Sequence, residues 1–245
     1  GFSRTNRLGQ AHIASYPSST FLFALLPVSS LRMRMRSVRF RSLLTDCLRT
    51  WNTVRTGLQE KSMRLFIASD LHGSPEAADF VRRRCRELAP DLCVLLGDYL
   101  YHGPRNPLPG GYAPQQTVSA LAAIETPVLA VRGNCDAEVD LMLLPFAVED
   151  SAAIAADGLR IVAQHGHRLP AFPPVPGVRA GDVVLSGHTH IPRGETIDGV
   201  HFWNPGSTTL PKGGFPPSYG LFEDGVFRVF SLDGRLVLEH RPAGN

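Results

Sequence analysis

Five short apolar stretches of this chain each end in polar residues of metal-binding types. The stretches are rich in Val, Leu and Ile and too short for helices, so they predict buried β-strands. The residues that follow them are Asp70 and His72, Asp98, Asn134, His165, and His188 and His190. These side chains can act together only if the fold brings the ends of all five strands to one edge.

The first part of the apolar pattern has the order of a β-α-β-α-β unit. Ser74 can cap a helix and Pro75 suits its first position, so a helix is predicted directly after the first strand. Strands and helices then alternate at residues 64–69, 75–88, 92–96, 116–124 and 127–131. This alternation predicts a mostly parallel sheet with helices packed on it.

The second half of the chain is richer in strands. Apolar stretches predict strands at residues 159–163, 182–186 and 200–203. The tail from Tyr219 to His240 alternates apolar and polar residues around Asp224-Gly225 and Asp233-Gly234, which predicts hairpins. Residues 63–245 therefore read as one α/β domain that is large enough to bury a substantial core.

Positive charge is concentrated in the first 62 residues. They carry 10 Lys and Arg against 2 acidic residues, whereas residues 63–245 carry 15 against 20. The whole-chain charge of +3 describes neither part. It gives no reason to expect nucleic acid as a partner.

Residues 1–62 contain no motif that predicts chemistry. Their longest apolar stretch, residues 21–28, is far shorter than the roughly 20 residues of a membrane span, so no membrane association is expected. Three interpretations stay open: non-native upstream sequence before a true start at Met63, an organellar targeting leader, or a nucleic-acid-binding arm. We expect a basic extension, disordered or non-native, on a cytoplasmic protein, with the organellar leader as the alternative location.

The polar residues at the strand ends form a mixed set of ligand types. Two carboxylates, one amide and four imidazoles suit divalent ions such as Mn²⁺, Zn²⁺ or Fe²⁺, and Ni²⁺ is also compatible. The four cysteines form no CxxC pair, which argues against a structural zinc site and against a disulfide scaffold. Seven side chains exceed what one ion would use, so two divalent ions are expected, with Mn²⁺ first.

Each of these residues has an ordinary structural explanation when taken alone. Asp or Asn at a strand end is commonly a turn or capping residue, and a buried His is commonly a hydrogen-bonded core residue. The joint pattern is harder to explain that way, because ligand types end five strands. Several of them also stand beside a Gly, whose missing Cβ lets backbone approach closely.

The order of these residues resembles the calcineurin-like metallophosphoesterase superfamily, and most of all its small bacterial phosphodiesterases of the YfcE type. The supporting stretches are residues 66–74, 102–106, 131–136, 204–207 and 211–214. The resemblance covers residues 63–245. It implies a four-layer α/β/β/α sandwich, in which two mixed sheets are flanked by helices.

The resemblance also implies how the ligands divide between two ions. Asp70, His72 and His190 would bind one ion, Asn134, His165 and His188 would bind the other, and Asp98 would bridge both. The implied activity is metal-dependent hydrolysis of a small phosphodiester by a hydroxide that bridges the ions. Hydrolysis of monoesters or pyrophosphates at the same site, and a non-catalytic scaffold of the same fold, are the alternatives. A homo-oligomer is possible.

Five further residues are candidates for catalysis or substrate binding. Cys135 stands where many superfamily members have His, so protonation of the leaving group is in doubt. His167 is expected to support His165 or the substrate, with a plain turn residue as the alternative. Arg105, Asn106 and Lys212 lie in Gly- and Pro-rich loops and are candidates for phosphate contacts.

Overall fold

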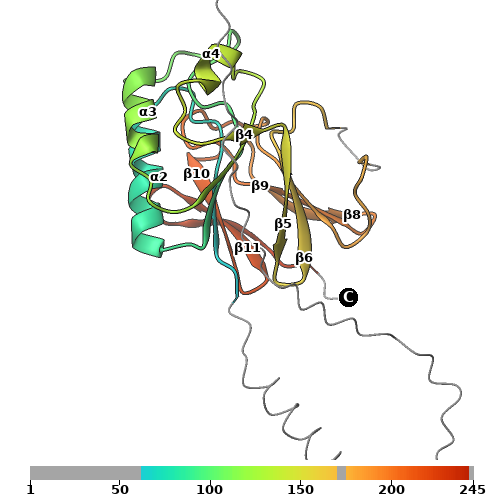
Figure 1. Ribbon diagram of the computed structural model, residues 1–245. Coiled ribbons are helices and arrows are strands. Elements are labelled where there is room, and N and C mark those ends of the chain that lie inside the picture. The colour runs from blue at the N-terminus through green and yellow to red at the C-terminus, as the bar shows by residue number, and fades with distance from the viewer. Residues whose placement is uncertain (1–61, 170–174, 243–245) are drawn as a thin grey trace, which may run out of the picture. The chain divides into compact units, whose positions relative to one another are not determined.

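Two β-sheets lie face to face in this computed structural model (Figure 1). The structure describes residues 62–169 and 175–242. The larger sheet has seven strands in the order β12 (Leu236–His240), β11 (Val226–Ser231), β10 (Ser218–Glu223), β1 (Leu65–Ala68), β2 (Leu92–Leu95), β3 (Val128–Val131) and β4 (Val148–Glu149). The strands from β1 to β4 are parallel to one another, and those from β10 to β12 are antiparallel.

The smaller sheet is also mixed. Its five strands follow the order β5 (Ser151–Ala156), β6 (Leu159–Gln164), β7 (Val183–Leu185), β9 (Val200–Asn204) and β8 (Arg193–Ile197). The three central strands are parallel, and the two edge strands pair antiparallel to their neighbours. Parallel strands thus form one side of the larger sheet and the centre of the smaller one, so the strand ends that carry polar residues gather at one edge of each.

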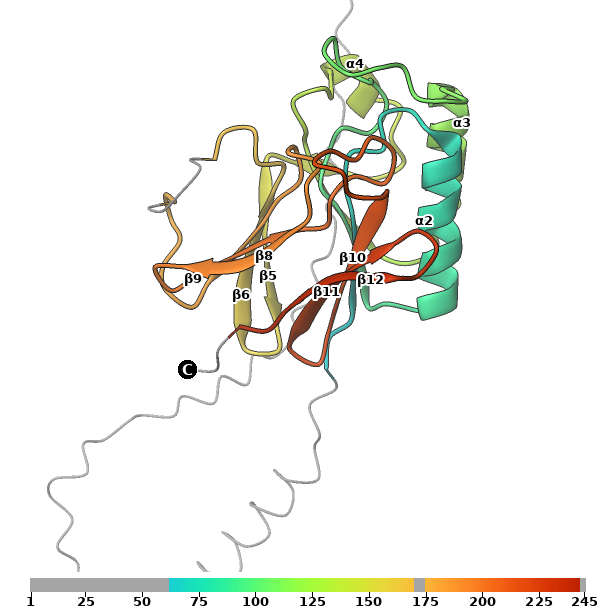
Figure 2. The same cartoon turned by 180° about the vertical axis from the view of Figure 1, so that it is seen from behind.

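Two helices cover the outer face of the seven-stranded sheet (Figures 1 and 2). They are α2 (Pro75–Leu88) and α3 (Pro114–Ala122), and a short helix, α4 (Glu138–Leu141), follows β3. Ser74 caps α2 as expected, because its side chain accepts a hydrogen bond from the Ala77 amide at 3.2 Å. The apolar face of α2 is buried against the sheet through Ala78, Val81 and Cys85.

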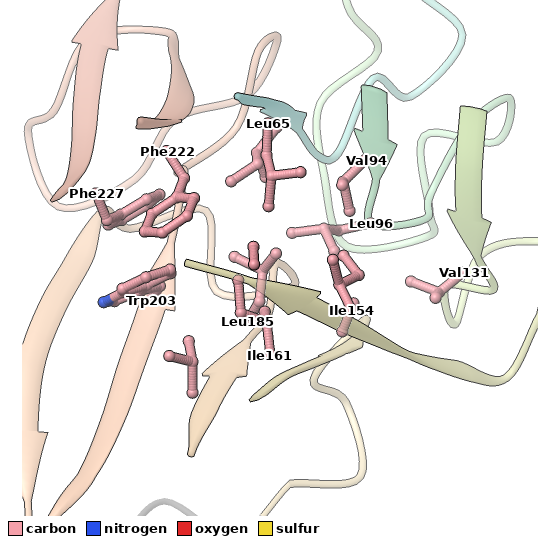
Figure 3. Close-up of a cluster of buried hydrophobic side chains, with 14 of the residues drawn as sticks. Leu65, Val94, Leu96, Val131, Ile154, Ile161, Leu185, Trp203, Phe222 and Phe227 are labelled. Atoms are coloured by element: carbon pink, nitrogen blue, oxygen red, sulfur yellow. The ribbon is translucent and has the colours of Figure 1, made fainter. Parts of the chain in front are cut away.

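The main core lies between the two sheets (Figure 3). Alternate residues of β1, such as Leu65 and Ile67, point into it, and their neighbours point toward the helices, as period-2 geometry requires. Trp203 of β9 is fully buried and stacks on Phe227 of β11, with ring centroids 4.8 Å apart. This contact joins the two sheets, so sheet-to-sheet distance depends on it.

The predicted fold class, two mixed sheets flanked by helices, is confirmed. Helices flank the seven-stranded sheet, whereas in the described part of the chain Leu169, Val175 and Val178 cover the outer face of the other sheet, over Val184 and Phe202. In the described residues no helix is both long and apolar enough for a transmembrane segment. The predicted extension 1–62 lies outside the described residues except for Ser62, and its boundary stays a prediction.

Most predicted strands are observed, and the differences have local causes. Strand β5 was not predicted, because four of its six residues are Ala, which favours strands weakly. Strand β8 was not predicted either, since its sequence is mostly polar. Helix α3 begins at Pro114 rather than at residue 116, because proline has a φ suited to the first helical position and lacks the N–H that would be unpaired there.

We expect Trp203→Ala to lower the free energy of unfolding by about 3–5 kcal/mol, because it empties a fully buried site at the contact between the sheets. Leu236→Ala is the matched control: Leu236 is 56% exposed on the edge strand β12, so its loss is expected to cost less than about 0.5 kcal/mol. Urea unfolding measures both. Equal effects of the two substitutions would contradict the assigned core.

Candidate metal centre

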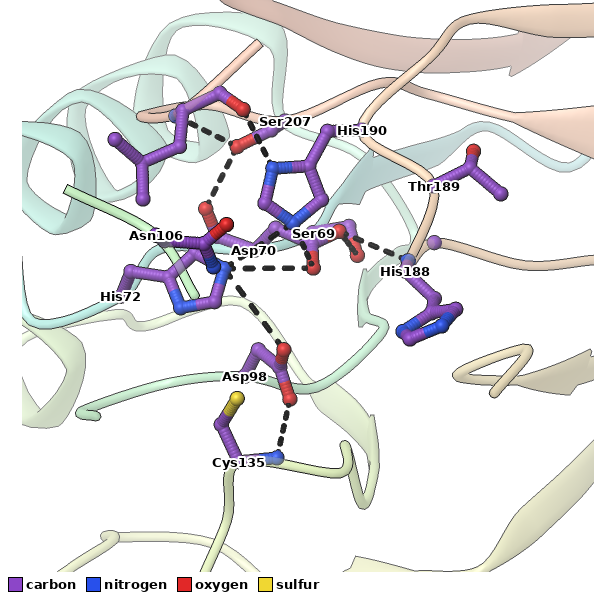
Figure 4. Close-up of polar contacts among 12 residues, drawn as sticks. Ser69, Asp70, His72, Asp98, Asn106, Cys135, His188, Thr189, His190 and Ser207 are labelled. Atoms are coloured by element: carbon purple, nitrogen blue, oxygen red, sulfur yellow. Dashed lines mark hydrogen bonds and ion pairs between the residues drawn. The ribbon is translucent and has the colours of Figure 1, made fainter. Parts of the chain in front are cut away.

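The carboxyl ends of five strands meet at one edge of the two sheets. β1, β2 and β3 bring Asp70, Asp98 and Asn134, and β6 and β7 bring His165 and the 188–190 loop. Backbone hydrogen bonds join these ends: the Asp70 amide donates to Gly97 at 3.1 Å, and the Gly187 amide donates to His165 at 2.8 Å. Residues far apart in sequence therefore surround one small volume (Figure 4).

Five of the predicted ligands have left-handed backbone conformations. Their φ angles are 57° at Asp70, 49° at His72, 57° at Asp98, 65° at His188 and 60° at His190. Such angles are uncommon outside glycine and cluster at functional sites. A left-handed residue turns the chain sharply at the strand end, so both ligands of Asp-X-His and of His-X-His can face one centre.

His72 and His190 direct their Nε2 atoms at Asp70. In each ring Nδ1 faces a backbone carbonyl, that of Tyr101 at 2.8 Å for His72 and that of Leu210 for His190, so Nδ1 carries the proton. Their Nε2 atoms lie 3.3 Å from each other and 3.7 and 3.2 Å from Asp70 Oδ1. Burial lowers the pKa of His72, which keeps that ring neutral.

The Asp70 carboxylate has a buried oxygen that no donor satisfies. Oδ2 accepts from the Ser69 hydroxyl at 2.6 Å and from the His188 amide at 3.1 Å. Oδ1 is buried without a hydrogen-bond donor. A carboxylate and two imidazoles whose unshared electron pairs face one another repel each other, which is unfavourable. These groups suit a cation held between them.

A second group of ligand atoms gathers around His165. Its Nδ1 faces the Leu96 carbonyl at 2.6 Å, and its Nε2 lies 3.1 Å from Asn134 Oδ1 and 3.4 Å from Asp98 Oδ1. Burial lowers the pKa of His165, but the carboxylates of Asp98 and Asp70 outweigh burial and raise it to about 9. Without a metal, a proton on His165 thus provides the positive charge that these acceptors need.

Asp98 lies between the two groups. Its Oδ2 is 3.8 Å from His72 Nε2, and its Oδ1 is 3.4 Å from His165 Nε2. Burial opposes its ionisation, but the hydrogen bond and charge of His165 hold the pKa of Asp98 below its usual value. Asp98 therefore has the position that a bridging carboxylate requires, while the bridging role itself stays a prediction.

His188 is placed less tightly than the other predicted ligands. Its ring lies beside that of His165, with centroids 5.2 Å apart, and burial lowers its pKa. Among the described residues, the groups of His, Cys and Asp ligand atoms that lie within 4.8 Å of one another do not include His188. They contain Asp70, His72, Asp98, Cys135, His165 and His190. Its ligand role stays a prediction.

Glycine is required where backbone passes close to the carboxylates. A Cβ on Gly133 would lie 2.0 Å from Asp98 Oδ1, and one on Gly187 would lie 1.9 Å from the Ser69 hydroxyl oxygen and 2.9 Å from Asp70 Oδ2. All three distances are shorter than real Cβ contacts. The glycines next to the ligands therefore make room for the carboxylates.

Asp136 supports the centre, and no role was predicted for it. Its carboxylate is buried and accepts hydrogen bonds from the amides of Asp98 at 2.9 Å, Tyr99 at 2.8 Å and Gly133 at 2.7 Å. These bonds tie the loop after β2 to the loop after β3. Burial raises the pKa of Asp136 to about 6. The Cys-Asp pair after Asn134 was the available signal, but spacing alone does not reveal a buried carboxylate.

Two residues of the 204–207 stretch orient the histidine loop. Ser207 Oγ donates to the Asp70 carbonyl at 2.9 Å and accepts from the Leu210 amide at 2.9 Å. Asn204 donates to the Gly187 carbonyl at 2.7 Å. The stretch contributed only to the family resemblance in the sequence, and the structure shows that it holds the backbone around His190.

A cleft of about 420 Å³ opens over the centre, between Asp98 and His190. The other predicted substrate and catalytic residues that line it are Arg105, Asn106, Asn134, Cys135 and Lys212. The Asn106 amide is engaged within its own loop, where it donates to His102 at 2.8 Å, and Arg105 and Lys212 are exposed.

His167 lies away from this cleft. It is exposed, and its ring contacts those of His165 and His188, with centroids 5.6 and 6.2 Å apart. The structure thus brings His167 beside two predicted ligands. Its supporting role stays a prediction.

We expect Asp136→Asn to lower the free energy of unfolding by about 1–3 kcal/mol, because an amide group would face buried N–H donors. Mn²⁺ affinity is expected to fall by about tenfold, since Asp98 loses its support. Asp198→Asn, the same change in the exposed β8–β9 turn, is the control. Urea unfolding and Mn²⁺ titration measure the effects, and unchanged Mn²⁺ affinity would contradict the role given to Asp136.

Comparison with known proteins places this arrangement in a family. Residues 63–224 match the calcineurin-like phosphoesterase superfamily domain. Phosphodiesterase YfcE of Escherichia coli K12 is 40% identical over 179 residues, which is 72% of this chain and 96% of the relative. A probable metallophosphoesterase of Bacillus subtilis, YsnB, is 30% identical over 189 residues, 75% of this chain and 94% of the relative.

The solved structure of the E. coli phosphoesterase YfcE agrees with this comparison. It superposes with a TM-score of 0.69 at 40% identity, over 74% of this chain and 100% of that chain. This chain belongs to the calcineurin-like phosphoesterase superfamily.

Proposed function

We propose that the protein is a metal-dependent phosphodiesterase that hydrolyses a small phosphoester. The observation that carries this proposal is a pair of polar groups that share Asp98. One group holds the Nε2 atoms of His72 and His190 beside a buried carboxylate oxygen without a donor, and the other holds His165 with Asn134. The 40% identity to a phosphodiesterase supports the same reaction class.

Two divalent ions fit this donor set. Asp70, His72 and His190 would hold one, and Asn134, His165 and His188 the other, with the carboxylate of Asp98 between them. When bound, such ions supply a hydroxide nucleophile near neutral pH and neutralise charge on the phosphoryl oxygens. Mn²⁺ is our first expectation, because carboxylate and amide oxygens are mixed with imidazoles.

The cleft above the centre supports binding of an anionic substrate. Arg105 and Lys212 extend from two different loops around Asp98 and are exposed. Guanidinium and ammonium groups bind phosphoryl oxygens by charge-assisted hydrogen bonds. We propose that these two residues attract and orient the phosphoester. We propose that Asn106 fixes the shape of the loop that carries Arg105.

Cys135 lines the same cleft, and its thiol is a poor proton donor. Its amide donates to Asp98 Oδ1 at 2.9 Å. Burial and the Asp98 carboxylate raise the pKa of Cys135 to about 12. A group this weakly acidic gives little general-acid catalysis near neutral pH. We therefore expect a preference for esters whose leaving groups need no proton.

We expect purified protein with added Mn²⁺ to hydrolyse bis-p-nitrophenyl phosphate, and EDTA to stop the reaction. Asp98→Ala removes the shared carboxylate and is expected to lower kcat by at least about 10³-fold. Asp79→Ala, on the exposed side of α2, is the control and is expected to retain activity. Release of p-nitrophenol measures the rate, and metal analysis after dialysis counts the ions.

The count of bound Mn²⁺ tests the centre independently of activity. Two ions per chain in the parent protein, and fewer in Asp98→Ala, are the expected results. Activity that survives both EDTA and Asp98→Ala would contradict a metal-dependent reaction, and one ion per chain in the active protein would contradict two ions. Hydrolysis of monoesters alone would replace the diesterase by the phosphomonoesterase alternative.

Cys135→His is expected to raise the rate for alkyl phosphodiesters relative to p-nitrophenyl phosphodiesters, because imidazole can protonate an alkoxide leaving group. Cys85→Ser, within α2, is the cysteine control. Steady-state rates on both ester types give the ratio. If Cys135→His leaves this ratio unchanged, the residue at position 135 has no part in protonating the leaving group.

A further inference from the structure

A chain of hydrogen bonds joins the two sheets outside the metal centre. The indole N–H of Trp203 in β9 donates to Nδ1 of His240, at the end of β12, at 2.9 Å. Nε2 of the same ring lies 3.1 Å from the hydroxyl oxygen of Thr196 in β8, and that oxygen lies 2.8 Å from Nδ1 of His201. Because β12 belongs to the larger sheet and β8 and β9 to the smaller one, these residues connect the sheets. We call Trp203, His240, Thr196 and His201 the sheet latch.

The donors of the sheet latch fix where its protons lie. An indole N–H can only donate, so Nδ1 of His240 must be an unprotonated acceptor. A neutral His240 then carries its proton on Nε2 and donates it to the Thr196 hydroxyl oxygen. The hydroxyl keeps its own hydrogen, which it can donate to Nδ1 of His201. The sheet latch is therefore complete only while His240 is neutral.

Close packing holds His240 in this position. A Cβ on Gly194 of β8 would lie 2.8 Å from the Cβ of His240, so the end of β12 lies directly on β8. The ring centroid of His240 is 5.6 Å from that of His201 and 6.3 Å from that of Trp203. Backbone and rings this close leave His240 little room to shift, so a change in its charge acts on its hydrogen-bond partners.

A second proton on His240 would break its bond to Trp203. Both ring nitrogens of an imidazolium are donors, so an Nδ1–H group would face the indole N–H across 2.9 Å. Trp203 is fully buried, and a buried N–H without an acceptor is unfavourable. His201 differs, because a protonated Nδ1 there could still donate to the Thr196 oxygen. His240 is therefore the acid-sensitive member of the sheet latch.

The acids near the sheet latch are already paired with arginines. Charged and titratable groups on the strands around His240 are Arg193 and Glu195 of β8, His201 of β9, Arg228 of β11, and Glu239 and Arg241 beside it in the chain. Glu195 pairs with Arg193, and Glu239 pairs with Arg228. Asp182, whose carbonyl accepts from the His201 amide, pairs with Arg160. A proton on His240 would thus have to compete for these carboxylates.

The stability that the sheet latch contributes depends on pH. Burial and the neighbouring His201 lower the pKa of His240 against the opposing charge of Glu195, and burial lowers the pKa of His201. A histidine in the unfolded chain has a pKa of about 6.5. The contribution is therefore complete above about pH 6.5 and is lost as the pH falls toward the lower pKa of the folded state. Thr196 is exposed, so water reaches the hydroxyl between the rings.

We infer that the sheet latch is an acid-sensitive switch, which is closed while His240 is neutral and opens when that ring takes up a proton. Opening would free the end of β12 from β8 and β9. Strand β9 continues from Trp203 to Asn204, whose side chain donates to the Gly187 carbonyl at 2.7 Å, next to His188. The switch thus acts on the strand that supports the histidine loop. It needs neither metal nor substrate, so it is independent of the proposed function.

The indole N–H of Trp203 reports the sheet latch directly in the unaltered protein. The chain has two tryptophans, and Trp203→Phe identifies the signal of Trp203 in a ¹H–¹⁵N correlation spectrum. We expect this signal to shift, and the protection of the indole N–H against hydrogen exchange to fall about tenfold, between about pH 7.5 and about pH 5.5. A signal and a protection that stay constant over this range would overturn the inference.

His240→Gln separates the sheet latch from the other titrating groups. Glutamine can accept from Trp203 through its carbonyl oxygen and donate to Thr196 through its amide, but it takes up no proton in this range. Over the same fall in pH we expect Tm of the variant to drop by about 2–4 °C less than Tm of the parent protein, a shift on the scale of one hydrogen bond in a domain of this size. His102→Gln makes the same change in the loop after β2 and is the control, expected to behave like the parent protein.

Thermal unfolding with EDTA and again with Mn²⁺ distinguishes the sheet latch from the metal centre, whose histidines also titrate. We expect the difference between the parent protein and His240→Gln in both series. An equal loss of Tm in the two proteins, or a difference confined to the EDTA series, would overturn the inference and leave the proposed function untouched. Should His240→Gln fail to fold, the indole signal of the parent protein decides alone.

Discussion

The carboxylate of Asp136 is the contact on which the rest of the centre depends. It accepts three backbone hydrogen bonds, from Asp98, Tyr99 and Gly133, and so joins the loops after β2 and β3. Those loops carry Asp98 and Asn134. Because Asp98 lies between the His72 and His165 rings, a shift of its loop would separate the two groups of predicted ligands.

The arrangement of polar groups at the centre is unfavourable without positive charge, and packing between the two sheets offsets this cost in stability. Five of the predicted ligands have left-handed backbones, each of which costs roughly 1–3 kcal/mol when held in place. One carboxylate oxygen of Asp70 is buried without a donor. Packing of Trp203, Phe222 and Phe227 between the sheets stabilises the fold that holds these residues in position. Bound cations would remove the repulsion between acceptors, so metal binding and stability are linked.

Sequence patterns predicted the elements with strong local signals. Strands rich in Val, Leu and Ile were recognised, and the helix after Ser74 was recognised from its cap and proline. Strand β5 was missed because alanines dominate it, and its pairing with β6 rather than its own composition makes it a strand. The candidate ligands were found because metal-binding residue types recur at strand ends, which is a one-dimensional pattern.

The sequence by itself determined the order of the strands with strong apolar patterns, the candidate ligand types and the family. Only the tertiary structure decided the distances: which nitrogen of each histidine faces the centre, that Asp98 lies between two groups, and that Asp136 is buried among amides. It also decided that His240 of β12 lies against Trp203 of the other sheet. The physical reason is that composition and periodicity act over a few residues. Contacts such as Asp136–Tyr99, His165–Leu96 and His165–Asn134 instead join residues 30 or more positions apart through sheet pairing and side-chain packing.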